Sequence, residues 1–125
     1  VIRIDHDYVE LTKEQRDEIL KIAARQKTTP EDILDKLRGR QVWIKHQDNI
    51  VTRYAHLHTV SEDLQVGDRV LANQYIGQVG NSGTSDAVNE TRGEAHLHFE
   101  IWVNNRYFGK GLTPIEIRTI LSKIL

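Results

Sequence analysis

The sequence contains no cysteine and no methionine, and only 2 prolines and 2 phenylalanines occur among its 125 residues. Without cysteine, a disulfide framework and a cysteine-ligated zinc site are both excluded. Without methionine, the chain does not start at an initiator residue, so we expect a fragment or a processed chain. No apolar run approaches the roughly 20 residues of a membrane-spanning helix.

Neither sign of charge dominates the sequence. It has 17 Lys+Arg against 18 Asp+Glu, a formal net charge of -1 and a pI near 6.6. A nucleic-acid surface needs a basic excess and a membrane surface needs a Lys/Arg-rich run, and the sequence has neither. We expect no nucleic-acid partner and no membrane span.

The length suits one domain with its own core, so we expect a single domain over residues 1–125, incomplete at its N-terminus.

The first third of the chain predicts a pair of helices after a short strand. Alternating residues 1–6 predict the strand. Thr12 and Gln15 have the spacing of a capping box, and an apolar face runs on to about residue 26. A second helix is expected with Thr29 as N-cap, Pro30 at the first helical position and Gly39 at its end. We therefore expect a helical insertion over about residues 11–38.

After this insertion the apolar period changes to two, which indicates strands. The predicted fold is mainly β, an antiparallel sheet with a helical hairpin inserted between strands and a helix at the C-terminus. The remaining expected features are strands at 42–46, 50–57 and 95–103, turns at Asp48-Asn49 and Asn104-Asn105, a long polar loop before residue 95, and a helix capped by Thr113.

The tetrapeptide AHLH occurs twice, at residues 55–58 and 95–98, and holds four of the six histidines. In a strand, residues two apart share a face, so His96, His98 and Glu100 should lie together. Two such imidazoles can converge on one metal ion, and zinc favours neutral imidazole nitrogen. Glu100 either orients a metal-bound histidine or is a solvated charge at the rim. The opposite face, with Leu97, Phe99 and Ile101, should anchor the strand in the core.

The stretch "LQVGDRVLANQYIGQVGNSG" places glycines and an aspartate where tight turns need them. Val66, Val70, Ile76 and Val79 can fill a small β core between these turns. Together with "GRQVWIKHQDNIVTRYAHL" and "HLHFEIWVNNRYFGKGLTPIE", it resembles the C-terminal two-thirds of LytM/lysostaphin-type zinc metallopeptidases, the M23 family. The resemblance covers about residues 39–116 in the order found in that family.

This resemblance implies a role for each histidine. The second histidine of HxH, His98, would bind zinc. His96 would be a general base or would stabilise the transition state beside the metal-bound water, and His56 of YAHL would be its catalytic partner. His58 would be an ordinary surface residue, and His46 and His6 would be structural.

One motif of the family is missing. Its zinc ions are also held by a histidine and an aspartate of an upstream HxxxD, and "HDYVE" (His6 and Glu10) is the only comparable string here. We expect the remaining zinc ligands upstream of Val1, so this chain alone should bind zinc weakly or not at all.

The resemblance implies a zinc endopeptidase that hydrolyses peptides of bacterial cell-wall peptidoglycan, outside the cytoplasm. The helical insertion could pack as a lid, bind a partner protein or occupy the cleft. The alternative is a catalytically inactive domain of the same fold that binds wall peptides or activates a partner hydrolase. A biotinyl-type carrier is disfavoured because no lysine lies between Lys45 and Lys110.

Overall fold

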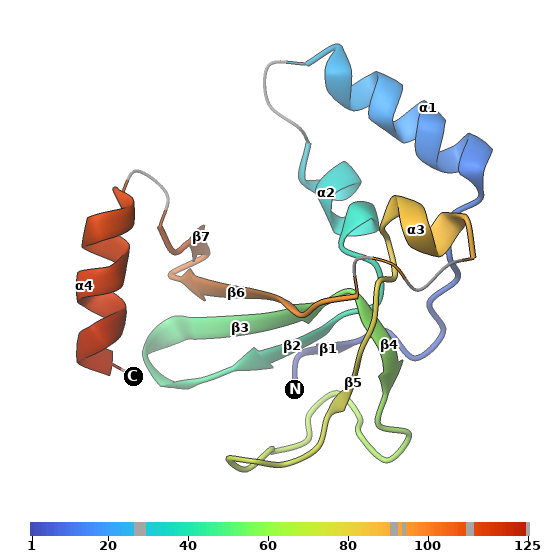
Figure 1. Cartoon of the computed structure of the whole chain (residues 1–125). Coiled ribbons are helices and arrows are strands. Elements are labelled where there is room, and N and C mark those ends of the chain that lie inside the picture. The colour runs from blue at the N-terminus through green and yellow to red at the C-terminus, as the bar shows by residue number, and fades with distance from the viewer. Residues whose placement is uncertain (27–29, 91–92, 94, 110–111, 125) are drawn as a thin grey trace.

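The computed structural model describes residues 1–26, 30–90, 93, 95–109 and 112–124. A five-stranded sheet has the order β1-β2-β3-β6-β7, and every neighbouring pair is antiparallel. Strands β4 and β5 form a separate two-stranded ribbon below one end of the sheet (Figure 1). The predicted mainly β, antiparallel fold is confirmed. The strands are β1 (Arg3–Ile4), β2 (Val42–Lys45), β3 (Ile50–Ala55), β4 (Leu57–Val60), β5 (Gly77–Val79), β6 (His98–Val103) and β7 (Arg106–Tyr107).

Helices α1 (Lys13–Ala24) and α2 (Glu31–Leu37) lie between β1 and β2 in the sequence. Because β1 pairs directly with β2, the two helices form an insertion, as predicted. The capping box of Thr12 and Gln15 is present at the start of α1. Pro30 occupies the N-cap of α2 instead of its first helical position, and Thr29 lies outside the described residues. Gly39 follows α2 with a φ of 71°, which suits its predicted role as helix stop.

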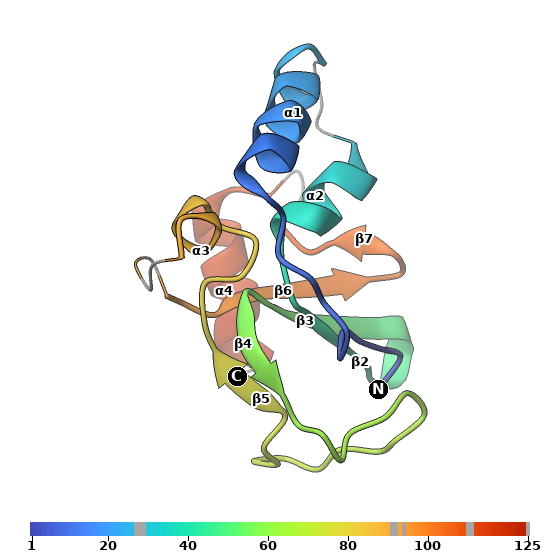
Figure 2. The same cartoon turned by 90° about the vertical axis from the view of Figure 1, so that its right-hand side faces the viewer.

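The helices contribute little to the core. Helix α1 has no buried residue, and Ile33 is the only buried residue described in α2. Figure 2 shows both helices standing beyond one end of the sheet. The C-terminal helix α4 (Pro114–Ile124) begins with Thr113 and Glu116 bonding each other's backbone N–H groups, so the predicted cap is confirmed. No helix in the described part of the chain has the length and apolar character needed to cross a membrane.

The apolar core lies between β2, β4 and the loop after β4. Val42, Ile44, Leu57 and Leu64 are buried there, and Val70 and Ile76 pack against them. The prediction for the glycine-rich segment was half right, because Val66 and Val79 are 62% and 51% exposed. Of the four apolar residues predicted to fill the core, only Val70 and Ile76 reach it.

Both predicted asparagine turns are confirmed. Asp48 and Asn49 have positive φ between β2 and β3, and Asn104 and Asn105 have positive φ between β6 and β7. Positive φ at two successive residues suits the right-handed twist of a hairpin, and asparagine and aspartate tolerate it. Each turn sets the register of its own hairpin, β2 with β3 and β6 with β7.

Two expectations about the second AHLH copy were wrong. Strand β6 begins at His98, so His96 precedes the strand. Leu97 and Phe99 are 44% and 46% exposed, whereas Glu100 is 6% exposed. The reason is that buried arginines and α2 cover the face that carries Glu100.

The expected long polar loop also contains a short helix, α3 (Ser85–Val88), because Thr84 caps it by accepting a hydrogen bond from the Ala87 N–H.

Candidate metal and catalytic site

The site forms where β3 ends beside the start of β6. Ala55, the last residue of β3, pairs with His98, the first residue of β6. His56 follows at a φ of 57°, so the chain turns there and continues as β4. The backbone N–H of His96 donates to the Gly80 carbonyl at 3.1 Å, which holds the approach to β6 against β5. The two AHLH copies therefore meet at one place.

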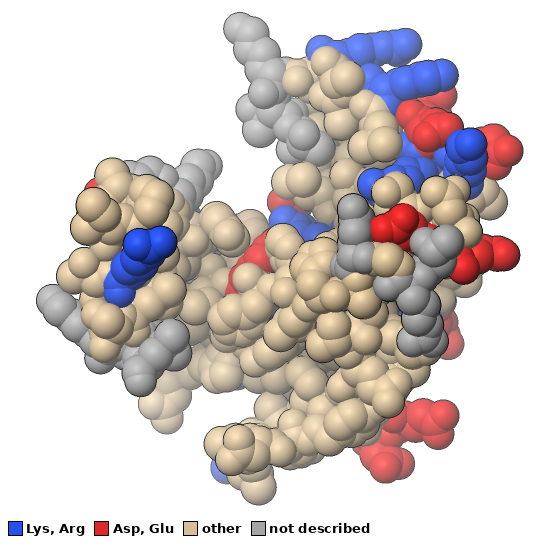
Figure 3. Space-filling view, viewed as in Figure 1, with Lys and Arg blue, Asp and Glu red and all other residues tan. Residues whose placement is uncertain are grey.

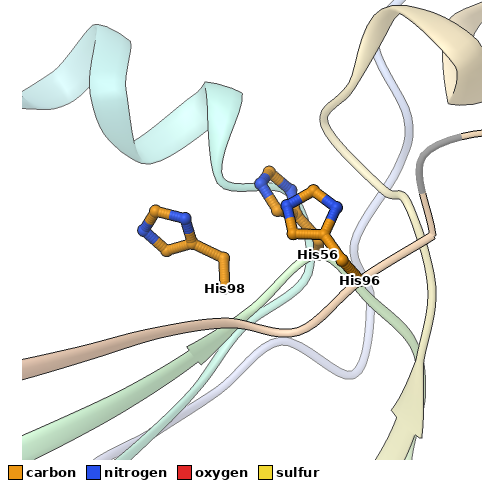
Figure 4. Close-up of side chains that lie close together, drawn as sticks. All are labelled: His56, His96 and His98. Carbon is orange, nitrogen blue, oxygen red and sulfur yellow. The ribbon is translucent and has the colours of Figure 1, made fainter.

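His56, His96 and His98 form one cluster on the side of the sheet where α2 lies (Figure 4). One ring nitrogen from each lies within 4.8 Å of the others, and this is the only cluster of metal-ligand type among the described residues. The ring centre of His56 is 5.0 Å from that of His96 and 5.4 Å from that of His98. Nitrogens bound to one tetrahedral zinc ion, each at about 2.0–2.1 Å, lie roughly 3.4 Å apart.

His56 is held in one tautomer. Its Nδ1 lies 2.6 Å from the Ser82 carbonyl oxygen, which can only accept, so the proton is on Nδ1 and the Nε2 lone pair is free. Burial lowers the pKa of His56, and the neighbouring His98 and His96 lower it further, against the opposing effect of the Ser82 carbonyl. The ring is therefore neutral at neutral pH, as a zinc ligand or a proton acceptor must be.

His98 is oriented by a buried carboxylate. Its Nε2 lies 2.7 Å from Oε2 of Glu100, so Nε2 carries the proton and the Nδ1 lone pair is available. Burial raises the pKa of Glu100, but hydrogen bonds from Trp102, His98 and Arg38 outweigh it and leave that pKa below its usual value. Glu100 is thus an ionised, buried partner of His98 and not a rim charge. Metal-bound histidines commonly have such a carboxylate on the far nitrogen.

The other histidines lie outside the cluster. His58 is exposed on β4, beyond the turn at His56. Nε2 of His46 is 2.8 Å from the Thr52 hydroxyl, and Nε2 of His6 is 2.6 Å from the Leu64 carbonyl. Glu10 accepts from the Gly83 N–H at 3.0 Å, so "HDYVE" adds no ligand to the cluster.

Sequence reasoning missed two residues that support the cluster. Ser82, in a segment interpreted only as turns, accepts from His56 through its carbonyl and donates its hydroxyl to the Leu57 carbonyl at 2.7 Å. Arg38, at the end of α2, donates to Glu100 at 3.0 Å. The signal for Ser82 was the adjacent Gly83, where a Cβ would lie 2.5 Å from the Gly39 nitrogen. Such close backbone approach marks a segment packed against another one.

The donors of the cluster fit zinc. All three are imidazoles, and two have a fixed tautomer with the lone pair of one nitrogen free, which is the form that zinc binds. The cluster contains no carboxylate ligand, because Glu100 is engaged on the far side of His98.

Three imidazoles that converge beside an antiparallel β-sheet form a group that could hold a divalent metal ion. A family model gives the class of protein, because residues 21–109 match Peptidase family M23. The chain belongs to peptidase family M23, as the motifs indicated. No curated protein matches the chain as a relative.

Proposed function

We propose that this chain carries most of the active site of a zinc metalloendopeptidase. The observation that carries the proposal is the convergence of His56, His96 and His98, with His98 tied to a buried carboxylate, in a chain of peptidase family M23. In this proposal His98 is the zinc ligand, and His96 and His56 are catalytic residues. The remaining histidine and aspartate ligands are supplied by sequence upstream of Val1.

Each side chain has a task that its surroundings support. A bound zinc ion would lower the pKa of its water and polarise the scissile carbonyl. The free Nε2 of the neutral His56 can accept a proton or, when protonated, donate to a developing oxyanion. His96 is exposed at the mouth of the cluster, where it can exchange protons with water and substrate. His98, held by Glu100, keeps its Nδ1 directed at the metal position.

For the substrate we propose peptides of bacterial peptidoglycan, with the protein outside the cytoplasm. The support for both is the resemblance of the YAHL, IGxVGxSG and HLHFE motifs to cell-wall peptidases. A space-filling view shows a hollow between α4 and the inserted helices, with acidic and basic side chains at its base (Figure 3). An extended peptide needs an open surface of this kind.

The second candidate is an inactive domain of the same fold that binds wall peptides or activates a partner hydrolase. The observation in its favour is that, among the residues that the structure describes, the cluster offers imidazoles alone and no aspartate. Zinc held in the full-length protein, together with peptide-bond cleavage, separates the two candidates.

The test uses the full-length protein, its zinc content and its turnover of peptidoglycan peptides. His98→Ala should lose zinc, and His96→Ala should keep most of its zinc but lose turnover. Zinc retained by His98→Ala would contradict the ligand assignment. Full turnover in His96→Ala would contradict its catalytic role, and a wild-type protein that binds peptide without cleaving it would favour the inactive domain.

A further inference from the structure

Glu100 joins the histidine cluster to the rest of the fold. Its Oε2 accepts from Nε2 of His98 at 2.7 Å and from Nε of Arg38 at 3.0 Å, and its Oε1 accepts from Nε1 of Trp102 at 2.8 Å. A buried carboxylate is stable only when its oxygens are paired in this way. The direction of the His98 ring therefore depends on whatever fixes Oε2.

Arg38 fixes that oxygen from outside the sheet. It is the C-cap of α2, within the inserted hairpin, and its side chain is 10% exposed. Its Nη1 also donates to Glu31 at 2.6 Å, so the guanidinium is held at both ends. The backbone carbonyl of Arg38 accepts from the His56 N–H at 2.8 Å. A single residue of the insertion thus contacts His56 directly and His98 through Glu100.

We propose that Arg38 is a positioning residue of the active site, which keeps the proton of His98 on Nε2 and its Nδ1 directed at the cluster. This inference rests on the proposed function for its catalytic meaning. The helical insertion is then part of the site's support and not a movable cover. Arg53 cannot replace Arg38. Its guanidinium carbon is stacked 3.7 Å from the ring centre of Trp43 and 3.9 Å from that of Trp102. Its Nη1 is 3.8 Å from Oε1 of Glu100, which is too far for a hydrogen bond.

Arg3 provides a matched control. It holds the same helix through Asp35, with Nη1 2.6 Å from Oδ1, and it has no contact with Glu100. Arg3→Ala therefore weakens the attachment of α2 without removing the hydrogen bond at Oε2. Any effect that both variants share does not come from the hydrogen bond at Oε2, because Arg3 pairs with Asp5 and Asp35 and lies over Trp43.

The first measurement is Co²⁺ affinity of the full-length protein, titrated by its visible absorption. Arg38→Ala should bind about 10-fold more weakly than wild type, the usual loss when a partner behind a metal ligand is removed. Arg38→Lys should recover part of the loss, since lysine keeps the charge without the planar fork. Arg3→Ala should bind as wild type does. An equal loss in Arg3→Ala and Arg38→Ala, or no loss in Arg38→Ala, would overturn the proposal.

The second measurement is the His98 tautomer, read by long-range ¹H–¹⁵N NMR in the metal-free protein. Wild type and Arg3→Ala should show the proton on Nε2, and Arg38→Ala should show a mixture of tautomers. A pure Nε2–H tautomer in a folded Arg38→Ala protein would overturn the proposal. Because this readout needs neither metal nor turnover, it still decides the role of Arg38 if the protein proves to have no peptidase activity.

Discussion

At the scale of single residues, the two AHLH copies show how one sequence string can take two conformations. In the first copy His56 adopts a φ of 57°, which breaks the strand and buries its ring beside Ser82. In the second copy the strand starts at His98, so His98 and Glu100 share a face. The alternation of a continuous strand would have placed His56 and His58 together. The positive φ of His56 separates them instead.

The first prediction concerns His58. Because it lies on β4 beyond this turn and outside the cluster, His58→Ala should change kcat/KM by less than about twofold, below about 0.5 kcal/mol. His56→Ala, the matched change two residues earlier, should abolish turnover because it removes the buried imidazole. The measurement is peptide hydrolysis by the full-length protein. A large loss of activity in His58→Ala would place the first copy's second histidine in the site.

The second prediction concerns Gly39, at the contact between the inserted helices and the Ser82 segment. Its φ is 71°, and an added Cβ would lie 2.3 Å from the Ser82 backbone. Gly39→Ala should lower the free energy of unfolding by about 3 kcal/mol, from an unfavourable φ plus overpacking. Gly67 also has a positive φ but nothing lies within 4 Å, so Gly67→Ala should cost only about 1 kcal/mol. Urea unfolding gives both values, and equal losses would mean that the contact at Gly39 does not matter.

At the scale of elements, helix caps and turns were predicted correctly from the sequence. The capping boxes at Thr12 and Thr113 could be predicted from the sequence because their hydrogen bonds join residues three positions apart. Both asparagine turns could be predicted because Asn and Asp tolerate the positive φ that these turns need. The buried state of Glu100 could not be predicted, because it depends on Arg38, 62 positions away. Leu97 and Phe99 were wrongly predicted to be buried for the same reason, because the covered face of β6 is decided by residues far away in the sequence.

The candidate site was also predicted only in part. Motif resemblance brought His56, His96 and His98 together before any geometry was known, and the structure places them in one cluster. Their individual roles stay predictions. Ser82 and Arg38 were missed because their contributions come through a backbone carbonyl and a long-range hydrogen bond, which leave no periodic pattern in the sequence.

A third prediction follows from the caps. Helix α1 buries no residue, so its stability depends on local interactions such as the Thr12 box. Thr12→Ala should destabilise α1 by about 1 kcal/mol and speed amide exchange within it. The sheet amides should keep their protection, since the core around Val42 does not include α1. Hydrogen exchange followed by NMR is the measurement, and faster exchange spread equally over the sheet would contradict a local role for the cap.

At the scale of the whole molecule, charge and not apolar contact attaches the insertion to the sheet. Helix α2 buries only Ile33 among its described residues, whereas Arg3 pairs with Asp35 and Arg38 pairs with Glu100 across the junction. Acidic and basic side chains also gather over the inserted helices in Figure 3. An attachment made of ion pairs depends on pH and salt in a way that an apolar core does not.

The last prediction tests this attachment through Asp35. Burial raises the pKa of Asp35, but its hydrogen bonds and charge interaction with Arg3 outweigh it, so the pKa in the folded protein lies below its ordinary value. The unfolded chain therefore binds this proton more readily. The stabilisation is fully present above the unfolded pKa of about 3.9 and is lost as the pH falls through the lower folded value.

Because the Asp35 side chain is 31% exposed, its pairing should contribute no more than about 1 kcal/mol. Asp35→Asn should lose that amount at pH 7 and should show a smaller fall in stability than wild type between about pH 4 and pH 2. Asp32→Asn, an exposed change on the same helix, should follow the wild-type curve. Urea unfolding across this pH range measures all three proteins. If Asp35→Asn and wild type lose stability in parallel, the Arg3–Asp35 pair does not hold α2 to the sheet, and the attachment must come from Arg38 and the backbone contacts near Gly39.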